Sequence, residues 1–147
     1  MDILKILLIN FIAVGLMTVF TYLYSLARNI NFGQPHLLQY LINTARPCNN
    51  RITLGIWVGW ILHYMLGILF YYGYQLCRTL LGLTHSVWLG ILYGFFAGLI
   101  GVIGWYLMFR THRNPPAIPK TEYYLQLVVA HILFGLSVAI LLLKYPF

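Results

Sequence analysis

The stretch VWLGILYGFFAGLIGVIGWYLMF, residues 87–109, decides the fold because it contains no charged side chain. At about 1.5 Å per residue, a helix of this length crosses the roughly 30 Å hydrocarbon core of a bilayer. The rest of the 147-residue chain has a similar composition, with 61% hydrophobic and 7% charged residues. A soluble domain carries about 25% charged residues. We therefore predict that lipid surrounds this chain.

Apolar windows of spanning length recur along the sequence. Backbone amides in hydrocarbon must be paired within their own segment, which favours helices. The sequence thus predicts an all-α fold, a four-helix transmembrane bundle formed by the whole chain as a single membrane domain, residues 1–147. Between the first two spans, an amphipathic segment is expected to lie flat on the cytoplasmic surface of the membrane. The predicted spans are 3–26, 54–76, 87–109 and 123–143, and the interfacial segment is 35–46.

Basic residues predict the orientation of the bundle. Four spans place both chain ends on one side, and cytoplasmic loops carry an excess of Lys and Arg. The first and third loops hold more basic residues than the opposite ends, so we expect both termini on the non-cytoplasmic side. The first set is Arg28, Arg46, Arg51, Arg110, Arg113 and Lys120, and the second is Lys5, Arg78 and Lys144. These charges flank spans, which favours lipid headgroups over nucleic acid as their partners.

Tryptophan and tyrosine residues cluster towards the span ends. Amphipathic rings are enriched at the level of the lipid headgroups. We therefore interpret them mostly as interfacial anchors. They are Trp57, Trp60, Tyr71, Tyr72, Tyr74, Trp105, Tyr106, Tyr123 and Tyr124.

Two histidines fall within the predicted spans, His63 and His131. An ionisable residue inside a membrane is costly and generally faces the bundle interior. The second and fourth spans run in the same direction, and each histidine lies about two residues before the middle of its span. We therefore expect the two imidazoles to face each other near the midplane. Each is followed four residues later by a glycine, Gly67 or Gly135.

Three interpretations of the histidine pair stay open. The first is hydrogen bonding between helices. The second is a b-type haem held by two axial imidazoles in an electron-transfer subunit. The third is transport of protons or a small solute. Only the second calls for a cofactor, with the histidines as iron ligands and glycines that make room for the ring. Its residues are His63, His131, Gly15, Gly67, Gly94, Gly98 and Gly135.

Glycines repeat at intervals of four in the third span, at Gly90, Gly94 and Gly98. Small residues at this spacing let two helix backbones approach closely in lipid. Glycine also lets a backbone come close to a ligand. The stripe therefore predicts helix packing, or alternatively a groove for a flat cofactor or an apolar ligand.

The chain resembles two groups of proteins. Histidines on the second and fourth helices, with glycines on the first and third, resemble membrane cytochromes b, which implies haem. The segments GWILHYMLG (59–67) and AHILFG (130–135) are similar to a group of small four-span bacterial membrane proteins with no assigned activity. This second resemblance implies the bacterial cytoplasmic membrane and marks His63 and His131 as family-type positions.

Hydrolytic chemistry is not supported by the sequence. Asp2 and Glu122 are the only carboxylates, and they are predicted at span ends on opposite sides of the membrane. A carboxylate pair for acid–base catalysis or metal binding cannot form between them. We therefore expect a non-enzymatic protein that acts by helix packing in the bilayer. Its expected partners are copies of itself or other membrane subunits.

Overall fold

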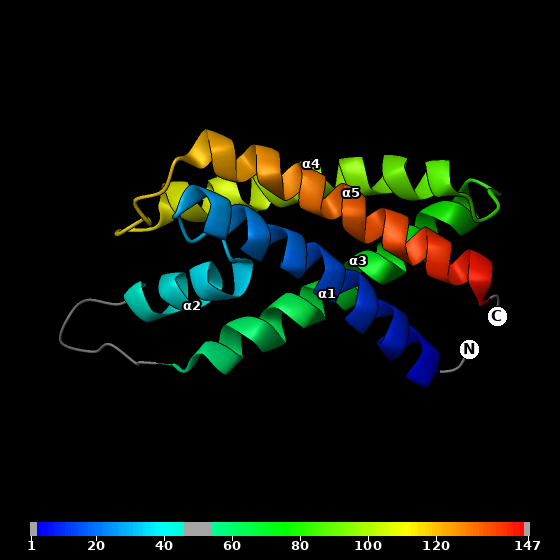
Figure 1. Ribbon diagram of the computed structural model, residues 1–147, viewed down its shortest axis with the longest axis horizontal. Coiled ribbons are helices and arrows are strands. Elements are labelled where there is room, and N and C mark those ends of the chain that lie inside the picture. The colour runs from blue at the N-terminus through cyan, green and yellow to red at the C-terminus, as the bar shows by residue number, and fades with distance from the viewer. Residues whose placement is uncertain (1–2, 46–53, 146–147) are drawn as a thin grey trace.

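The computed structural model describes residues 3–45 and 54–145, and within this part of the chain it contains five α-helices and no strand (Figure 1). The all-α fold is therefore confirmed. Four of the helices are long and apolar enough to cross a membrane, which indicates an integral membrane protein. The helices are α1 (Ile3–Arg28), α2 (Gln34–Thr44), α3 (Ile56–Leu80), α4 (Val87–Thr111) and α5 (Lys120–Lys144).

The first turn of α1 and the last turn of α5 lie at the same end of the bundle (Figure 1). This agrees with an even number of spans. Which side of a membrane this end faces stays a prediction. Arg46 and Arg51, two of the charges behind that prediction, lie outside the described residues.

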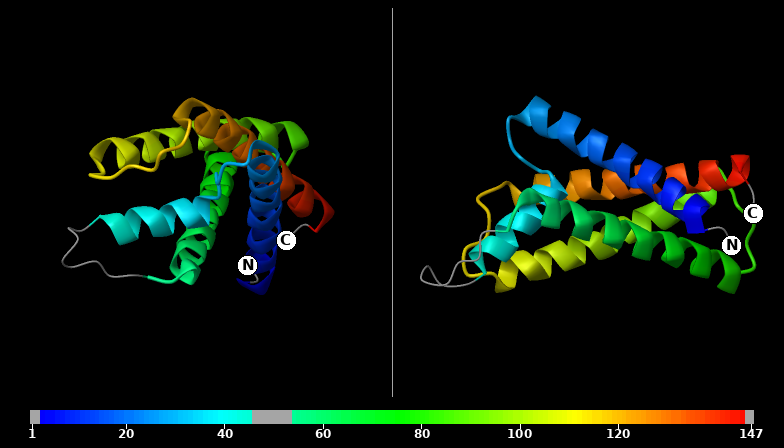
Figure 2. Two further views of the ribbon diagram at one scale, coloured as in Figure 1. Left: turned by 60° about the vertical axis from the view of Figure 1, so that its left-hand side comes forward. Right: turned by 90° about the horizontal axis from the view of Figure 1, so that it is seen from below.

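Helices α4 and α5 lie side by side in both directions of view (Figures 1 and 2). Their contact is made by glycine. A Cβ atom added to Gly94 would clash with the carbonyl oxygen of His131, and one added to Gly98 would lie 2.8 Å from the Cα atom of Val128. The carbonyl group of Gly135 lies equally close to Gly90. The glycine stripe therefore serves helix packing along this pair.

Helix α3 packs against α1 and diverges from α4. Gly67 brings α3 onto α1, because a side chain there would clash with Val14 and Asn10. Contact with α4 occurs near the connecting turn, where the hydroxyl group of Tyr93 donates to the carbonyl oxygen of Phe70 at 2.6 Å. From that turn the two helices separate (Figures 1 and 2). The bundle is therefore wedge-shaped, with α3 on one side and the α4–α5 pair on the other.

Helix α2 begins inside this wedge. After α1 the chain reverses at Asn29, whose φ of 51° is left-handed, and the amide of Phe32 donates to the Ser25 hydroxyl oxygen at 3.0 Å. Gln34, at the start of α2, is then only 2% exposed. Gly59 of α3 leaves room for the carbonyl group of Pro35.

The sequence placed segment 35–46 flat on the membrane surface, but the structure buries its first turn within the bundle. The apolar side of α2 fills space between diverging spans, where Leu37, Leu38 and Leu41 are buried. At its other end, the ring Nε2–H of His112 donates to the carbonyl oxygen of Leu41 at 2.9 Å. Packing against α3 and the end of α4 therefore decides where α2 lies. Residue 46 is outside the described residues.

Several aromatic residues interpreted as interfacial anchors are core residues instead. Tyr71, Tyr74, Tyr123 and Trp105 are buried, so the anchor interpretation is wrong for these four. The ring of Trp105 meets that of Tyr123 edge-to-face, with 5.4 Å between centroids.

The glycine contact between α4 and α5 predicts a large cost for a single methyl group. We expect Gly94→Ala to lower the free energy of unfolding by about 1–3 kcal/mol, because backbone atoms of α5 must move to admit it. Gly15, whose Cβ position is open, supplies the control. Gly15→Ala should be neutral or stabilising by about 0.5–1 kcal/mol, since it removes a glycine from a helix interior. Unfolding in mixed detergent micelles measures both, and equal effects would contradict the packing.

Candidate functional site

A cavity of about 280 Å³ lies in the wedge between α3 and the α4–α5 pair. All five helices line it. Its described lining residues are apolar, with three polar exceptions and the indole of Trp105, and none of them is charged. The polar exceptions are Gln34 of α2, His63 of α3 and His131 of α5. An apolar cavity with a few convergent polar groups is the usual form of a small-molecule site.

The cavity opens between α3 and α4. Leu66 and Leu69 on α3, and Ile100 on α4, line it and are exposed on the outside of the bundle. These positions lie well inside helices α3 and α4, away from their ends. In a membrane, this opening therefore faces the hydrocarbon of the lipid and not either aqueous phase.

The hydrogen bonds of His131 determine which of its ring nitrogens faces the cavity. Its Nδ1 atom lies 2.8 Å from the carbonyl oxygen of Leu127, one helical turn earlier. A carbonyl oxygen can only accept, so Nδ1 carries the proton. In the neutral ring, Nε2 then keeps a lone pair. Nε2 lies beside Gly101, another residue of the cavity wall, where a Cβ atom would be only 3.3 Å away.

His63 is oriented by a neighbouring helix. The hydroxyl group of Thr18 on α1 donates to the carbonyl oxygen of Val14 at 2.7 Å. Its oxygen lies 3.0 Å from Nε2 of His63. Because the only hydroxyl proton is already used, Nε2–H of His63 donates to Thr18, and Nδ1 keeps the lone pair of the neutral ring. The pair links α1 to α3.

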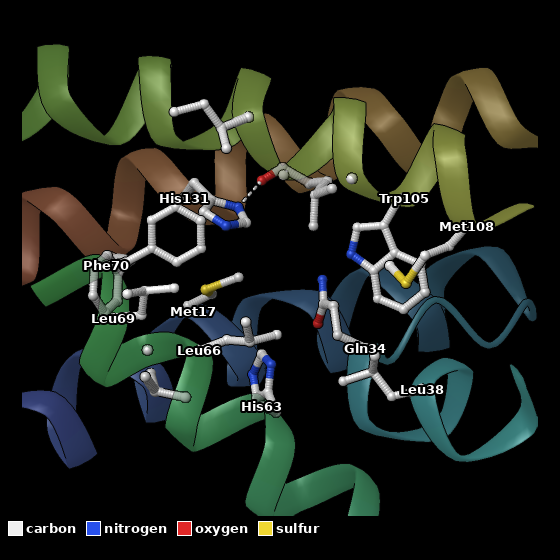
Figure 3. A pocket seen from close by; sticks show the side chains of 17 residues that line it. Met17, Gln34, Leu38, His63, Leu66, Leu69, Phe70, Trp105, Met108 and His131 are labelled. Atoms are coloured by element: carbon white, nitrogen blue, oxygen red, sulfur yellow. Dashed lines mark hydrogen bonds between the residues drawn. The ribbon is translucent and has the colours of Figure 1, made fainter. Parts of the chain in front are cut away.

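The two histidines stand on opposite walls of one cavity (Figure 3). Each ring is hydrogen-bonded to a residue other than the opposite histidine. His63 bonds to Thr18, and His131 bonds to Leu127. The expectation that both rings face a common space therefore agrees with the structure. Direct hydrogen bonding between them does not occur. The ring of Phe70 packs edge-on against His131, with 5.2 Å between centroids.

Gln34 reaches the cavity from α2 and is incompletely hydrogen-bonded. Its Nε2 atom donates to the hydroxyl oxygen of Thr21 at 3.3 Å. The single hydroxyl proton of Thr21 has two acceptors within reach, the carbonyl oxygen of Met17 and the side-chain oxygen of Gln126. Oε1 of Gln34 and Nε2 of Gln126 are buried and have no partner among the described residues. Buried acceptors without a partner are rare and costly.

Trp105 lies on the far side of the cavity from Phe70 (Figure 3). Its indole nitrogen, which is a donor only, is turned towards the interior. The side chain is 7% exposed and is held by contacts with Phe109 and Tyr123. The cavity therefore presents the indole N–H of Trp105 as a donor and one unprotonated nitrogen of each histidine as an acceptor.

The residues predicted for a cofactor site divide into two groups. His63, His131 and Gly67 line the cavity. The others do not line it. Gly94, Gly98 and Gly135 are occupied by the contact between α4 and α5, and Gly15 lies on α1 with open space beside it.

Sequence reasoning missed Gln34 and the inward position of Trp105. Gln34 directly precedes the segment interpreted as an interfacial helix, and nothing local indicates that the chain turns back into the bundle. Trp105 occurs near the end of an apolar run, a position typical of an interfacial anchor. Gly104, one residue before it, lines the cavity mouth.

Comparison of the chain with protein-family models, with curated proteins and with solved structures finds no match. The function is therefore argued from the cavity itself.

The bond between Thr18 and His63 predicts energetic coupling between α1 and α3. In a double-mutant cycle of Thr18→Val and His63→Phe, we expect a coupling free energy of about 0.6–1.7 kcal/mol, the range for polar contacts between membrane helices. Unfolding in mixed micelles measures it.

Thr111 supplies the control for this cycle, because its hydroxyl group is exposed and bonds within its own helix. Thr111→Val and His63→Phe should be additive within about 0.5 kcal/mol. Additivity of Thr18→Val with His63→Phe would show that the bond does not contribute.

Proposed function

We propose that this chain is a non-enzymatic integral membrane protein that binds a small apolar molecule taken from the lipid into its histidine-lined cavity. One observation carries the proposal. An uncharged cavity with inward-facing polar atoms opens through the bundle wall between Leu66 and Leu69 of α3 and Ile100 of α4.

The size of the cavity supports a small ligand. An engineered protein cavity of about 150 Å³ stays dry and binds benzene, and the cavity here is about 280 Å³. A single substituted ring therefore fits. Met17, Leu127 and Phe134 provide apolar walls for it.

The direction of access also supports a lipid-soluble ligand. Tyr93 ties α3 to α4 near the turn, and α2 fills the other end of the wedge. The route that remains is the opening between the middle parts of α3 and α4. A molecule dissolved in hydrocarbon meets this opening directly, whereas a polar solute would first have to cross lipid.

Haem is the alternative ligand, and the lining residues fit it less well. His131 has the arrangement of an axial ligand, with Nδ1–H bonded to a carbonyl oxygen and Nε2 free. However, the lining includes no cation for the propionate groups, and Nε2 of His63 is bonded to Thr18. An absorption spectrum of the purified protein separates the two proposals, because haem would give a Soret band that is lost in His131→Ala.

Two predictions from the sequence remain proposals beside this one. Membership in a larger membrane complex, through copies of the chain or other subunits, is compatible with a bound apolar ligand. Transport would need polar groups continuing from the cavity towards water. The network of Gln34, Thr21 and Gln126 runs from the cavity towards α5, which makes this the first place to test for such a path. We also propose that the membrane is the bacterial cytoplasmic one.

A photoactivatable phenyl diazirine, dissolved in the lipid of proteoliposomes, tests the proposed function. We expect labelling of Met17 and Leu127, which are buried within the bundle but line the cavity. Gly104→Leu should reduce this labelling about tenfold by filling the mouth, because its Cβ position is open and the new side chain meets no backbone. Mass spectrometry of the illuminated protein identifies the labelled residues.

Gly15→Leu is the matched control, since it adds the same side chain at an open position outside the cavity. It should leave the labelling of Met17 and Leu127 unchanged. Exposed positions such as Leu4 should be labelled equally in all three proteins. If Met17 and Leu127 are never labelled, or are labelled equally in the Gly104→Leu protein, the cavity does not take up apolar molecules.

A further inference from the structure

The unpaired polar atoms of the cavity are mainly hydrogen-bond acceptors. Nε2 of His131 and Nδ1 of His63 carry lone pairs in the neutral rings, because their partner nitrogens are the donors. These two atoms come from two different helices, α5 and α3.

The two imidazole nitrogens are the strongest sign that a ligand belongs here. Neither has a hydrogen-bond partner among the described residues, and the two rings stand on opposite walls of the cavity (Figure 3). In hydrocarbon there is no water to satisfy an acceptor, so leaving it unpaired costs free energy. A donor on a bound molecule would remove that cost.

We propose that the ligand is an uncharged ring compound with free hydroxyl groups, of the phenol or hydroquinone class. This inference rests on the proposed function. One ring hydroxyl group donates to Nε2 of His131, and a second one, where the ring carries it, donates to Nδ1 of His63. A hydroxyl oxygen also accepts, so the indole N–H of Trp105 can donate to it. The ring itself packs against Phe70 and the other aromatic walls.

Other ligand classes match the cavity less well. A carboxylate or phosphate would need a cation, and an amine would need a carboxylate, but no charged residue is among the described lining residues. A ketone or ether offers acceptors only, which would face the two acceptors already present. A long-chain alcohol carries a donor but has no ring to pack against Phe70. A hydroxylated ring offers both within a cavity of about 280 Å³.

The test compares 4-tert-butylphenol with 4-tert-butylanisole, which has nearly the same shape but no hydroxyl proton. Each is titrated into the full-length protein in detergent micelles, and the thermal stabilisation at known free concentration gives the dissociation constant. The phenol should bind the wild-type protein about 3- to 10-fold more tightly than the anisole, the worth of one or two hydrogen bonds. The phenol has one hydroxyl proton, which either imidazole can accept, so this ratio should fall to about 2 or less when both His63→Phe and His131→Phe are present.

The wild-type comparison needs no variant, so it holds even if one substitution prevents folding. Gly104→Leu separates the two proposals, because it should abolish stabilisation by both compounds, whereas Gly15→Leu should not. Equal binding of phenol and anisole, lost in Gly104→Leu, would overturn the hydroxyl preference and leave the proposed function standing. Stabilisation that is unchanged in Gly104→Leu would overturn both. An unaltered phenol preference in the protein that carries both His63→Phe and His131→Phe would overturn the assignment of the acceptors.

Discussion

The close contact between α4 and α5 is the constraint on which the rest of the bundle depends. In lipid there is no hydrophobic effect to bring helices together, so their association relies on close packing. Gly94 and Gly135 let these two backbones meet, and this contact buries the glycine face of α4. Another face of α4 must therefore meet α3, and near the turn that contact depends on the bond from Tyr93 to Phe70. The two helices then diverge, and the cavity follows from this divergence.

Hydrocarbon also explains how the polar residues of the cavity are arranged. A polar group without a partner costs more there than at a wetted surface. Two of the polar side chains have their N–H donors satisfied within the protein, since His63 donates to Thr18 and His131 donates to Leu127. Each imidazole keeps one unprotonated nitrogen, because a neutral ring can donate only once. The cavity is therefore left with more unpaired acceptors than donors.

The sequence predicted the parts of this structure that depend on local composition. Four long apolar helices follow from segment length and from the need to pair backbone amides. The burial of Gln34 could not be predicted, because it depends on the reversal at Asn29 and on the space at Gly59 of a distant helix. The inward orientation of Trp105 could not be predicted for the same reason. Its position near a span end is local information, whereas its inward orientation depends on contacts with Tyr123.

The two His-x-x-x-Gly segments place a histidine next to a helix contact in the same way on two different helices. Residues four apart lie on one face of a helix, so the glycine that draws in a neighbouring helix also sets which way the histidine points. Gly67 draws α3 onto α1 and thereby brings His63 to Thr18. Gly135 draws α5 onto α4, and His131 then lies over Gly101 of the same helix α4. The histidines have different hydrogen-bond partners but occupy the same relation to a glycine contact. Packing and cavity lining are therefore consequences of the same helix faces, and a change that widens either contact would also displace the polar atoms on which ligand recognition depends.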